Sequence, residues 1–405
     1  MRCASAFSTR SDLQSALDEA CGAVLDELDS PVDLAFVFLS SLYLQNPGPC
    51  GPLEMSEQLT QRLGTRNLLG SSGESIVGNQ YELEWQPALA LWVASFDACR
   101  IDTFSLDFQP RDGEGAFVGW PNWIDDPWPA EATLFLLADP FSFPADVFLS
   151  RMNEDRPGVP VIGGVASGAG APGEARLVCG NDVFDRGAVV ARVSGDFRIR
   201  SVVSQGCRPI GKPLVITAGE RNEIRQLGGK PALAQLEQIF EALPNREKQL
   251  VNRGLYVGRV ISEYQDQFMQ GDFLIRNVTG IDQTSGTIVI ADYVRPGQTV
   301  QFQVRDAETA HLDLQQMLQR LPADSGTPQG GLLFTCNGRG TRLFPAEHHD
   351  AALVQQSLGS IPLAGFFAAG EAGPVGGRNF LHGFTASLAL FDSHRETANR
   401  PGDRP

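Results

Sequence analysis

Short, nearly continuous apolar runs recur along the chain, and each is followed by a helical pattern and a second short apolar segment. An apolar run without polar alternation is typical of a strand covered on both faces. The first unit has its leading run at 33–40, its predicted helix at 53–63, its returning segment at 68–70 and its follow-on strand at 87–96. The same four parts lie at 133–138, 144–152, 161–163 and 187–193 in the second unit. In the third unit they lie at 332–335, 350–358, 363–365 and 384–391. This order predicts three βαβ-type units that are divergent copies of one pattern.

A glycine-rich stretch follows each returning segment. The three stretches read GSSGESIVG at 70–78, GGVASGAGAPG at 163–173 and GFFAAGEAGPVGG at 365–377. Glycine adopts positive φ readily and allows a ligand or another backbone to approach closely. We predict these stretches as loops, and the sequence leaves open whether they meet in one cleft.

The pattern changes between the second and third units. An amphipathic helix at 231–243 ends at Pro244, and a second helix is predicted at 306–321. Between them, segments at 255–262, 273–277, 287–291 and 299–304 predict strands of a smaller, more antiparallel region. We predict a first domain over 1–228, a second over 229–392, and a disordered tail over 393–405, where polar residues lack periodicity.

Charge and composition exclude several classes of function. The chain has 405 residues and a formal charge of −16, which disfavours nucleic acid or an anionic membrane surface as a partner. The N-terminal residues lack the apolar core of a signal peptide, and no apolar run approaches about 18 residues. The seven cysteines are scattered, without a CxxC pair. We therefore predict a reduced, cytoplasmic protein without membrane insertion.

Motifs near the C-terminus carry a resemblance to a known family. They are Cys336-Asn337-Gly338-Arg339-Gly340, Pro362-Leu363-Ala364-Gly365-Phe366-Phe367, Gly370-Glu371 and Asn379-Phe380-Leu381-His382-Gly383. Together they resemble the C-terminal part of the FIST family, a sensory domain of bacterial signalling proteins and eukaryotic F-box proteins. Residues 33–96, with Ser71 and Ser72 in a small-residue turn, are similar to the family's N-terminal opening. The resemblance implies binding of a small ligand, with an amino acid as the first guess.

Arg339 and Glu371 are the leading ligand candidates. Arg339 follows a buried strand, where open α/β sheets place their ligands, and its guanidinium can hold a carboxylate with two hydrogen bonds. The alternative is a salt bridge between loops, to Glu371 or Asp350. Glu371 can receive an ammonium group, or it can accept backbone N–H bonds within its own stretch.

Cys336 is the candidate nucleophile, because it ends a strand beside Asn337 and His382 lies downstream. Its alternative is a small buried residue, which is the common environment of a free cysteine. Arg378, Asn379 and His382 close the same glycine-rich stretch and complete the predicted ligand site with Ser71, Ser72 and Asn337. Three tryptophans at 120, 123 and 128 lie in a proline-rich loop that lines a pocket or covers a sheet edge.

Phosphate, metal and cofactor motifs are not indicated. None of the glycine-rich stretches matches GxxxxGK[ST] or a GxGxxG motif with its following helix. His348 and His349 are adjacent at a predicted helix start, so they point in different directions, and we predict no metal site there. We predict no cofactor.

These observations predict an α/β fold of repeated βαβ-type units in two pseudo-similar domains, with the mixed antiparallel region in the C-terminal half. The leading function is a cytoplasmic sensory protein that binds a small polar ligand and contacts a signalling partner. Two alternatives stay open. One is an enzyme that uses Cys336, or Arg339 with Glu371 and His382, on a small substrate. The other is an interaction adaptor without a ligand.

Overall fold

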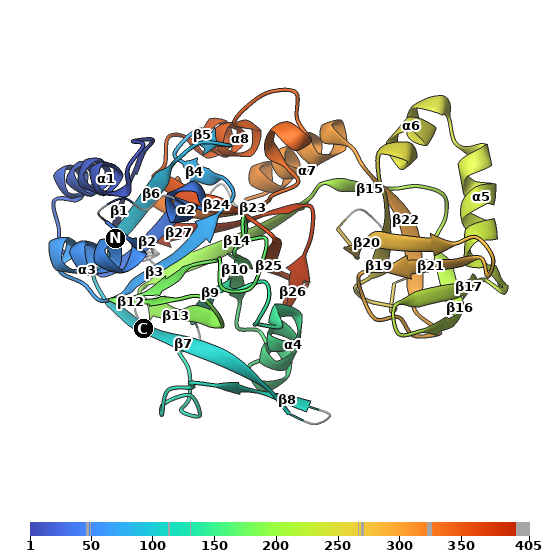
Figure 1. The fold of residues 1–405 in the computed structure, drawn as a ribbon, viewed down its shortest axis with the longest axis horizontal. Helices are drawn as coiled ribbons and strands as arrows, with labels where there is room; N and C mark the ends of the chain where they lie inside the picture. Colours follow the sequence, from blue (N-terminus) through green and yellow to red (C-terminus); the bar gives the residue numbers. More distant parts are fainter. Residues whose placement is uncertain are drawn as a thin grey trace, which may run out of the picture. The chain divides into compact units, whose positions relative to one another are not determined.

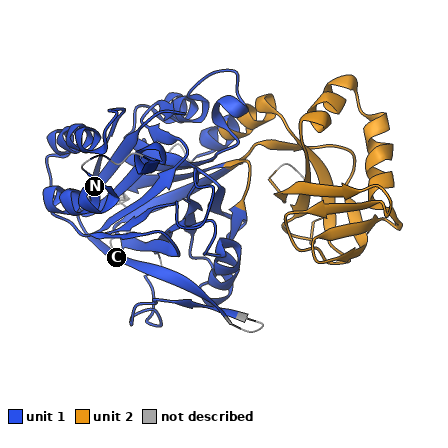
Figure 2. Cartoon of the chain, in the orientation of Figure 1, with its two compact units in different colours: residues 1–203, 315–381, 386–405 blue, residues 204–314, 382–385 orange. Residues whose placement is uncertain are grey.

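The computed structural model describes the chain except residues 46, 47, 49, 112, 113, 130, 266, 269, 270, 322–325 and 394–405. Of the predicted tail, only Ser393 therefore lies within the described residues. The chain forms two compact units (Figure 2). The first contains residues 1–203, 315–381 and 386 onward, and the second contains 204–314 and 382–385.

The predicted α/β class is confirmed, and the three βαβ-type units form the first unit (Figure 1). In each repeat the leading and returning strands are parallel, and the follow-on strand pairs antiparallel with the leading strand. The first repeat contains β2 (Leu34–Ser40), α3 (Pro52–Leu63), β3 (Leu68–Gly73) and β6 (Leu89–Ser95); the second β9 (Thr133–Ala138), α4 (Ala145–Asp155), β10 (Val161–Val165) and β13 (Ala188–Gly195); the third β23 (Gly330–Cys336), α8 (His349–Leu358), β24 (Leu363–Ala368) and β27 (Thr385–Ser393).

The first and third glycine-rich stretches are largely strands, which corrects their prediction as loops, whereas residues 166–173 of the second stretch form a loop as predicted. A short strand that lies within the stretch, or just after it in the second repeat, joins the sheet of another repeat, where it pairs antiparallel with the returning strand. The first repeat gives β4 (Ile76–Gly78) to β24, the second gives β11 (Leu177–Cys179) to β3, and the third gives β25 (Gly370–Val375) to β10. The exchange is therefore cyclic: first to third, third to second, and second to first.

Each exchanged strand is followed by a second short strand at the edge of the same sheet. These edge strands are β5 (Tyr81–Leu83), β12 (Asp182–Phe184) and β26 (Arg378–His382). The remaining elements that complete the first unit's sheets and layers are β1 (Arg2–Ser8), α1 (Leu13–Leu28), α2 (Leu42–Gln45), β7 (Cys99–Arg111), β8 (Glu114–Val118) and β14 (Phe197–Gln205).

Aromatic side chains fill the space between the three sheets. The Phe36 ring lies 5.2 Å from that of Phe135, and the Phe38 ring lies 6.1 Å from that of Phe334, centroid to centroid. Helices cover the outer faces, with α1 and α3 on the first repeat and α4 on the second. Strands buried on both sides explain why the leading runs are almost wholly apolar.

The second unit is built around antiparallel strands, as predicted for this region. Its strands follow the order β22, β16, β17, β21, β20, β19, and β19 pairs again with β22, so the sheet closes into a barrel. The elements are β15 (Cys207–Pro209), β16 (Leu214–Glu220), β17 (Glu223–Leu227), β18 (Lys230–Pro231), α5 (Ala232–Ala242), α6 (Asn245–Arg253), β19 (Leu255–Val260), β20 (Phe273–Asp282), β21 (Thr287–Ile290) and β22 (Thr299–Arg305). Helix α7 (Ala307–Gln319) then leads back into the first unit.

One glycine occupies the same position in each returning strand. Gly70, Gly163 and Gly365 are third in their strands, opposite Val37, Leu136 and Leu333 of the leading strands. A Cβ at Gly163 would lie 1.9 Å from the Leu136 carbonyl oxygen, and one at Gly365 would lie 1.8 Å from that of Leu333. These glycines therefore permit close approach of backbone to backbone within the parallel pair.

We expect Gly163→Ala and Gly365→Ala each to destabilise the protein by roughly 1–3 kcal/mol or more, because the added methyl group meets a backbone oxygen. Gly22 is the control, since it lies in α1 and a Cβ added there would have nothing within 4 Å of it. Gly22→Ala should be neutral or stabilising by about 1 kcal/mol. Urea unfolding measures all three, and equal stability of Gly365→Ala and the natural protein would contradict the expectation.

Candidate functional site

The segments that follow the parallel strands of all three repeats meet in the first unit. Glu74 N donates to Ser167 Oγ at 2.8 Å, and Ser167 Oγ donates to the Phe367 carbonyl. Phe367 N donates to Ser75 O at 2.9 Å, and Ala369 N donates to Val165 O at 2.9 Å. The carboxyl ends of the strands, where open α/β sheets bind ligands, are thus joined by direct hydrogen bonds.

Ser71 and Ser72 lie inside β3 and are fully buried, so the predicted turn at this place is a strand. Ser71 Oγ donates to Ser72 O at 3.0 Å, and Ser72 Oγ accepts from Arg176 N at 3.0 Å. Arg176 directly precedes β11, the strand that the second repeat contributes. The hydroxyl of Ser72 therefore fastens the exchanged strand to its sheet.

Arg339 is paired with Asp350, which is one of the two salt bridges that the sequence left open. Its Nε lies 2.6 Å from Asp350 Oδ2 and its Nη2 lies 2.8 Å from Oδ1, and both side chains are fully buried. Thr335 Oγ1 donates to the same carboxylate at 2.8 Å, and His349 Nδ1 lies 2.9 Å from it. Burial alone would raise the pKa of Asp350, but the Arg339 guanidinium holds it well below its usual range.

Glu82 joins this network from another repeat, and sequence reasoning missed it. It lies on β5 of the first repeat, and its Oε1 accepts from Asp350 N at 2.8 Å and Ala351 N at 3.0 Å. A carboxyl group thus caps the N-terminus of α8 in the third repeat. Burial, together with the Asp350 charge, raises the pKa of Glu82 to about 8. Among the described residues, Glu82 Oε2 has no hydrogen-bond partner.

Cys336 ends β23 and is 5% exposed. Its Sγ accepts from Gly338 N at 3.5 Å and lies 3.9 Å from Asn337 Oδ1. His382 is buried and belongs to the second compact unit, whereas Cys336 and Asn337 belong to the first. Glu371 is buried in β25, opposite Gly164 of the second repeat.

Asn379 connects β26 to the second repeat. Its side chain accepts from Val161 N at 2.8 Å and donates to Val159 O at 2.8 Å. Its backbone N donates to Asn153 Oδ1 at 2.7 Å, and Asn153 Nδ2 donates to its carbonyl at 2.8 Å. Asn379 therefore fixes α4 against the start of β10, while the neighbouring Arg378 is exposed.

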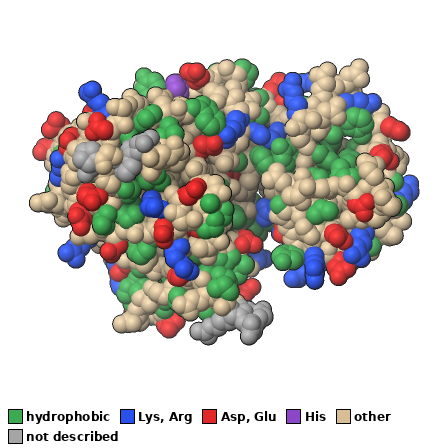
Figure 3. Space-filling model, viewed as in Figure 1, with side chains coloured by type: hydrophobic (Ala, Val, Ile, Leu, Met, Phe, Trp, Pro, Cys, Tyr) green, Lys and Arg blue, Asp and Glu red, His purple; other side chains and the backbone are tan. Residues whose placement is uncertain are grey.

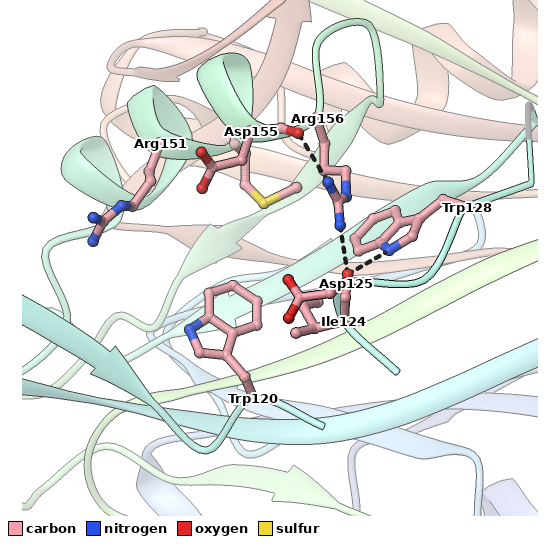
Figure 4. A pocket seen from close by; sticks show the side chains of 8 residues that line it. Trp120, Ile124, Asp125, Trp128, Arg151, Asp155 and Arg156 are labelled. Atoms are coloured by element: carbon pink, nitrogen blue, oxygen red, sulfur yellow. Dashed lines mark hydrogen bonds between the residues drawn. The ribbon is translucent and has the colours of Figure 1, made fainter. Parts of the chain in front are cut away.

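A cavity of about 500 Å³ lies beside α4, and none of the residues of the predicted ligand site lines it (Figure 4). One wall is the tryptophan loop (residues 119–129), and the other is the C-terminal half of α4 with the residue after it. Its lining residues are Trp120, Ile124, Asp125, Trp128, Arg151, Met152, Asp155 and Arg156. The volume falls within the range of roughly 300–1,000 Å³ that is usual for small-molecule sites.

Arg156 anchors the tryptophan loop. Its Nη2 donates to Ile124 O at 2.5 Å, and Trp128 Nε1 donates to the same oxygen at 3.1 Å. The Trp120 indole packs on the Phe148 ring with centroids 5.9 Å apart. The loop therefore lines a pocket, which is one of the two roles that the sequence left open, and its Trp120 packs on a residue of α4.

Three charged groups at the cavity have no ion pair. The side chains of Arg151, Asp125 and Asp155 are exposed, and none forms a salt bridge or hydrogen bond with any residue that the structure describes. Arg156, in contrast, uses its guanidinium on backbone oxygens. The cavity thus combines an aromatic and apolar lining with unpaired charges of both signs.

The described residues contain no cluster of three or more His, Cys, Asp or Glu side chains with metal-binding geometry. His348 Nδ1 lies against the Glu82 backbone, at 3.1 Å from its N and 3.0 Å from its O, whereas His349 contacts Asp350. The two adjacent histidines thus have different partners. Within the described part of the chain, no helix is long and apolar enough to cross a membrane.

Arg339→Ala should destabilise the protein by about 3–5 kcal/mol, because it leaves the Asp350 carboxylate buried without its cation. The double variant Arg339→Met/Asp350→Leu should recover part of this loss, since it removes both charges. Arg66→Ala, at an exposed arginine, is the control. Chemical denaturation measures each variant, and an Arg339→Ala protein as stable as Arg66→Ala would contradict a structural role for the pair.

Glu82 should make stability fall as pH rises. Its pKa is about 8 in the folded protein and near 4.5 in the unfolded chain. Between these pH values the folded protein keeps a proton on Glu82 that the unfolded chain releases. The contribution of this proton to the free energy of unfolding is therefore complete below pH 4.5 and is lost by about pH 8. Glu82→Gln should flatten the slope over this range, as measured by urea unfolding at pH 5, 6, 7 and 8. Parallel curves for the two proteins would show that Glu82 ionises normally.

Comparisons with known proteins show the family of this chain. The FIST N domain matches residues 33–230, and the FIST C domain matches residues 232–374. An uncharacterized protein of Mycobacterium tuberculosis strain H37Rv is 43% identical over 392 residues, which cover 96% of this chain and 100% of that protein. An uncharacterized protein of Mycobacterium bovis is 42% identical, over 96% of this chain and 99% of its own length. The chain belongs to the FIST family.

Proposed function

We propose that this protein is a cytoplasmic sensor that binds a small polar ligand beside α4 and passes its occupancy to a signalling partner. FIST domains are associated with signal transduction and sensing. An amino acid is the first candidate ligand, because it carries both charges on a small body.

The observation that carries the proposal is the cavity with its unpaired charges. Ligand sites combine a mostly apolar lining with a few placed polar groups. Trp120, Ile124 and Met152 supply the apolar surface, while Arg151 and Asp155 supply one charge of each sign. Because these two groups are unpaired among the described residues, a ligand can bind them without breaking a salt bridge.

The residues predicted from the sequence support this site indirectly. Asn379 holds α4, which carries Arg151 and Asp155, against the strand β10. Arg339 and Asp350 hold the third repeat together from a buried position. Direct ligand contacts by Asn337, Glu371, Arg378 and His382 stay a prediction.

Surface charge agrees with a small ligand and a protein partner. The chain carries a net charge of −16, and the visible face of the first unit shows acidic and basic side chains interspersed (Figure 3). Such a surface does not attract nucleic acid, which binds to basic patches.

A thermal-shift screen of the full chain against amino acids, nucleotides and small carboxylates tests the proposal. A ligand at a hundred times its Kd should add about 2.7 kcal/mol of stability. We expect Arg151→Ala to lose the response to zwitterionic or anionic ligands, and Arg66→Ala to keep it. Arg378→Ala is the comparison for the site predicted from sequence.

Three outcomes decide the matter. A response lost in Arg151→Ala places the ligand in the cavity beside α4. A response lost only in Arg378→Ala moves the site to β26. A folded protein that responds to nothing in the screen contradicts the sensor and favours an adaptor.

A further inference from the structure

We propose that the cavity beside α4 selects an organic cation, a primary ammonium group on an apolar body. This inference rests on the proposed function, since it takes the cavity as a ligand site. It narrows the ligand from a small polar molecule to an amine.

Two carboxylates at the cavity are without a partner among the residues that the structure describes. Asp125 and Asp155 each bring an unpaired carboxylate, whereas Arg151 is the one unpaired guanidinium among the lining residues, all of which the structure describes. The Arg156 guanidinium donates hydrogen bonds to the Ile124 and Asp155 carbonyl oxygens. The Arg156 guanidinium keeps its positive charge, so the lining is neutral overall, but the charged groups without a partner in the described part of the chain are two carboxylates and one guanidinium. An ammonium group can bind to either carboxylate.

Two tryptophans give the cavity an aromatic surface. An indole face attracts a cation through its quadrupole, and tryptophan does so best among the aromatic residues. This loop already binds cations in that way: the Arg192 guanidinium lies 3.6 Å from the Trp123 ring centroid, and the Arg156 guanidinium lies 5.3 Å from that of Trp128. Trp120 packs on Phe148, which holds its indole in place at the cavity.

The lining side chains come from two sides of the cavity. Figure 4 shows Asp155 extending from α4, with Asp125 and Trp120 on the loop that faces it. Met152 of α4 is buried and Ile124 is half-buried, so they offer apolar surface to the body of the ligand. An ammonium group held by the carboxylates leaves its apolar substituent against these side chains.

The net negative charge of the whole chain also favours a cation over an anion. A net charge of −16 raises the local concentration of cations and lowers that of anions. This attraction is screened by salt and acts alike on all ions of the same charge, so it cannot select one amine over another. Selection among amines must come from the cavity itself.

Phenethylamine and phenylacetate are the probes, because they share a ring and differ in the sign of their charge. Binding to the full chain is measured by calorimetry at 150 mM salt. We expect the amine to bind at least about tenfold more tightly than the acid. Asp155→Asn and Asp125→Asn should each weaken amine binding roughly fivefold, as partly exposed charge pairs do.

Glu154→Gln is the matched control, since Glu154 is an exposed acid beside Asp155 that does not line the cavity. It removes the same charge from the same helix and should leave amine binding unchanged. Equal losses in Glu154→Gln and Asp155→Asn would show general electrostatic attraction and would overturn the site.

The results separate this inference from the proposed function. Tighter binding of phenylacetate, lost in Arg151→Ala, overturns the amine and keeps the ligand site. Amine binding that survives the double variant Asp125→Asn/Asp155→Asn also overturns it. Absence of binding by both probes overturns the amine; only if the wider screen also gives no response does the sensor fall with it.

Discussion

The first unit depends on backbone hydrogen bonds between strands of different repeats. Each parallel pair would end in an exposed returning strand, and the strand sent from another repeat covers it. An uncovered edge strand is a template for pairing with other chains. The cyclic exchange covers the returning strand of all three repeats in the same way. Each repeat is therefore incomplete without a strand from another repeat.

Buried charge reinforces the exchange at the place where the first and third repeats meet. Glu82 lies on the exchanged hairpin of β4 and β5, and its carboxyl group caps α8, whose first turn contains Asp350. Arg339 then neutralises Asp350 in the same buried space. Removing one partner of a buried ion pair destabilises a protein by more than the intact pair stabilises it. The pair therefore serves mainly to fix one arrangement of the repeats. The family motif around Arg339 is thus, in this chain, part of the architecture.

The cavity beside α4 lies outside this network of buried charges, but the exchanged hairpin of the third repeat holds the helix that lines it. Asn379, on the exchanged hairpin of the third repeat, holds α4 and the start of β10. The chain continues from β26 into residues 382–385, which belong to the second compact unit. The helix that lines the cavity is therefore connected through one strand to residues 382–385, where the Phe384 ring packs on that of Tyr256 in β19.

Patterns along the chain were enough to define most elements of this fold. Apolar runs such as 34–40 and 133–138 marked the leading strands, because a strand covered on both faces needs no polar alternation. The repeated order marked three related units, and the motif around Cys336 and Arg339 marked the family. The tryptophans at 120 and 128 were visible as a rigid aromatic loop.

The strand pairing and the sites, in contrast, are properties of the folded chain. Gly78 pairs with Ala364, and a three-residue strand carries too little pattern to choose a partner so distant in the chain. Glu82 sits in no motif, and its pKa follows only from burial beside Asp350. Arg151 and Asp155 look like ordinary residues of an exposed helix face until the tryptophan loop packs opposite them. Local patterns report which face of an element is buried, whereas a site depends on which elements meet, and only the folded chain fixes that.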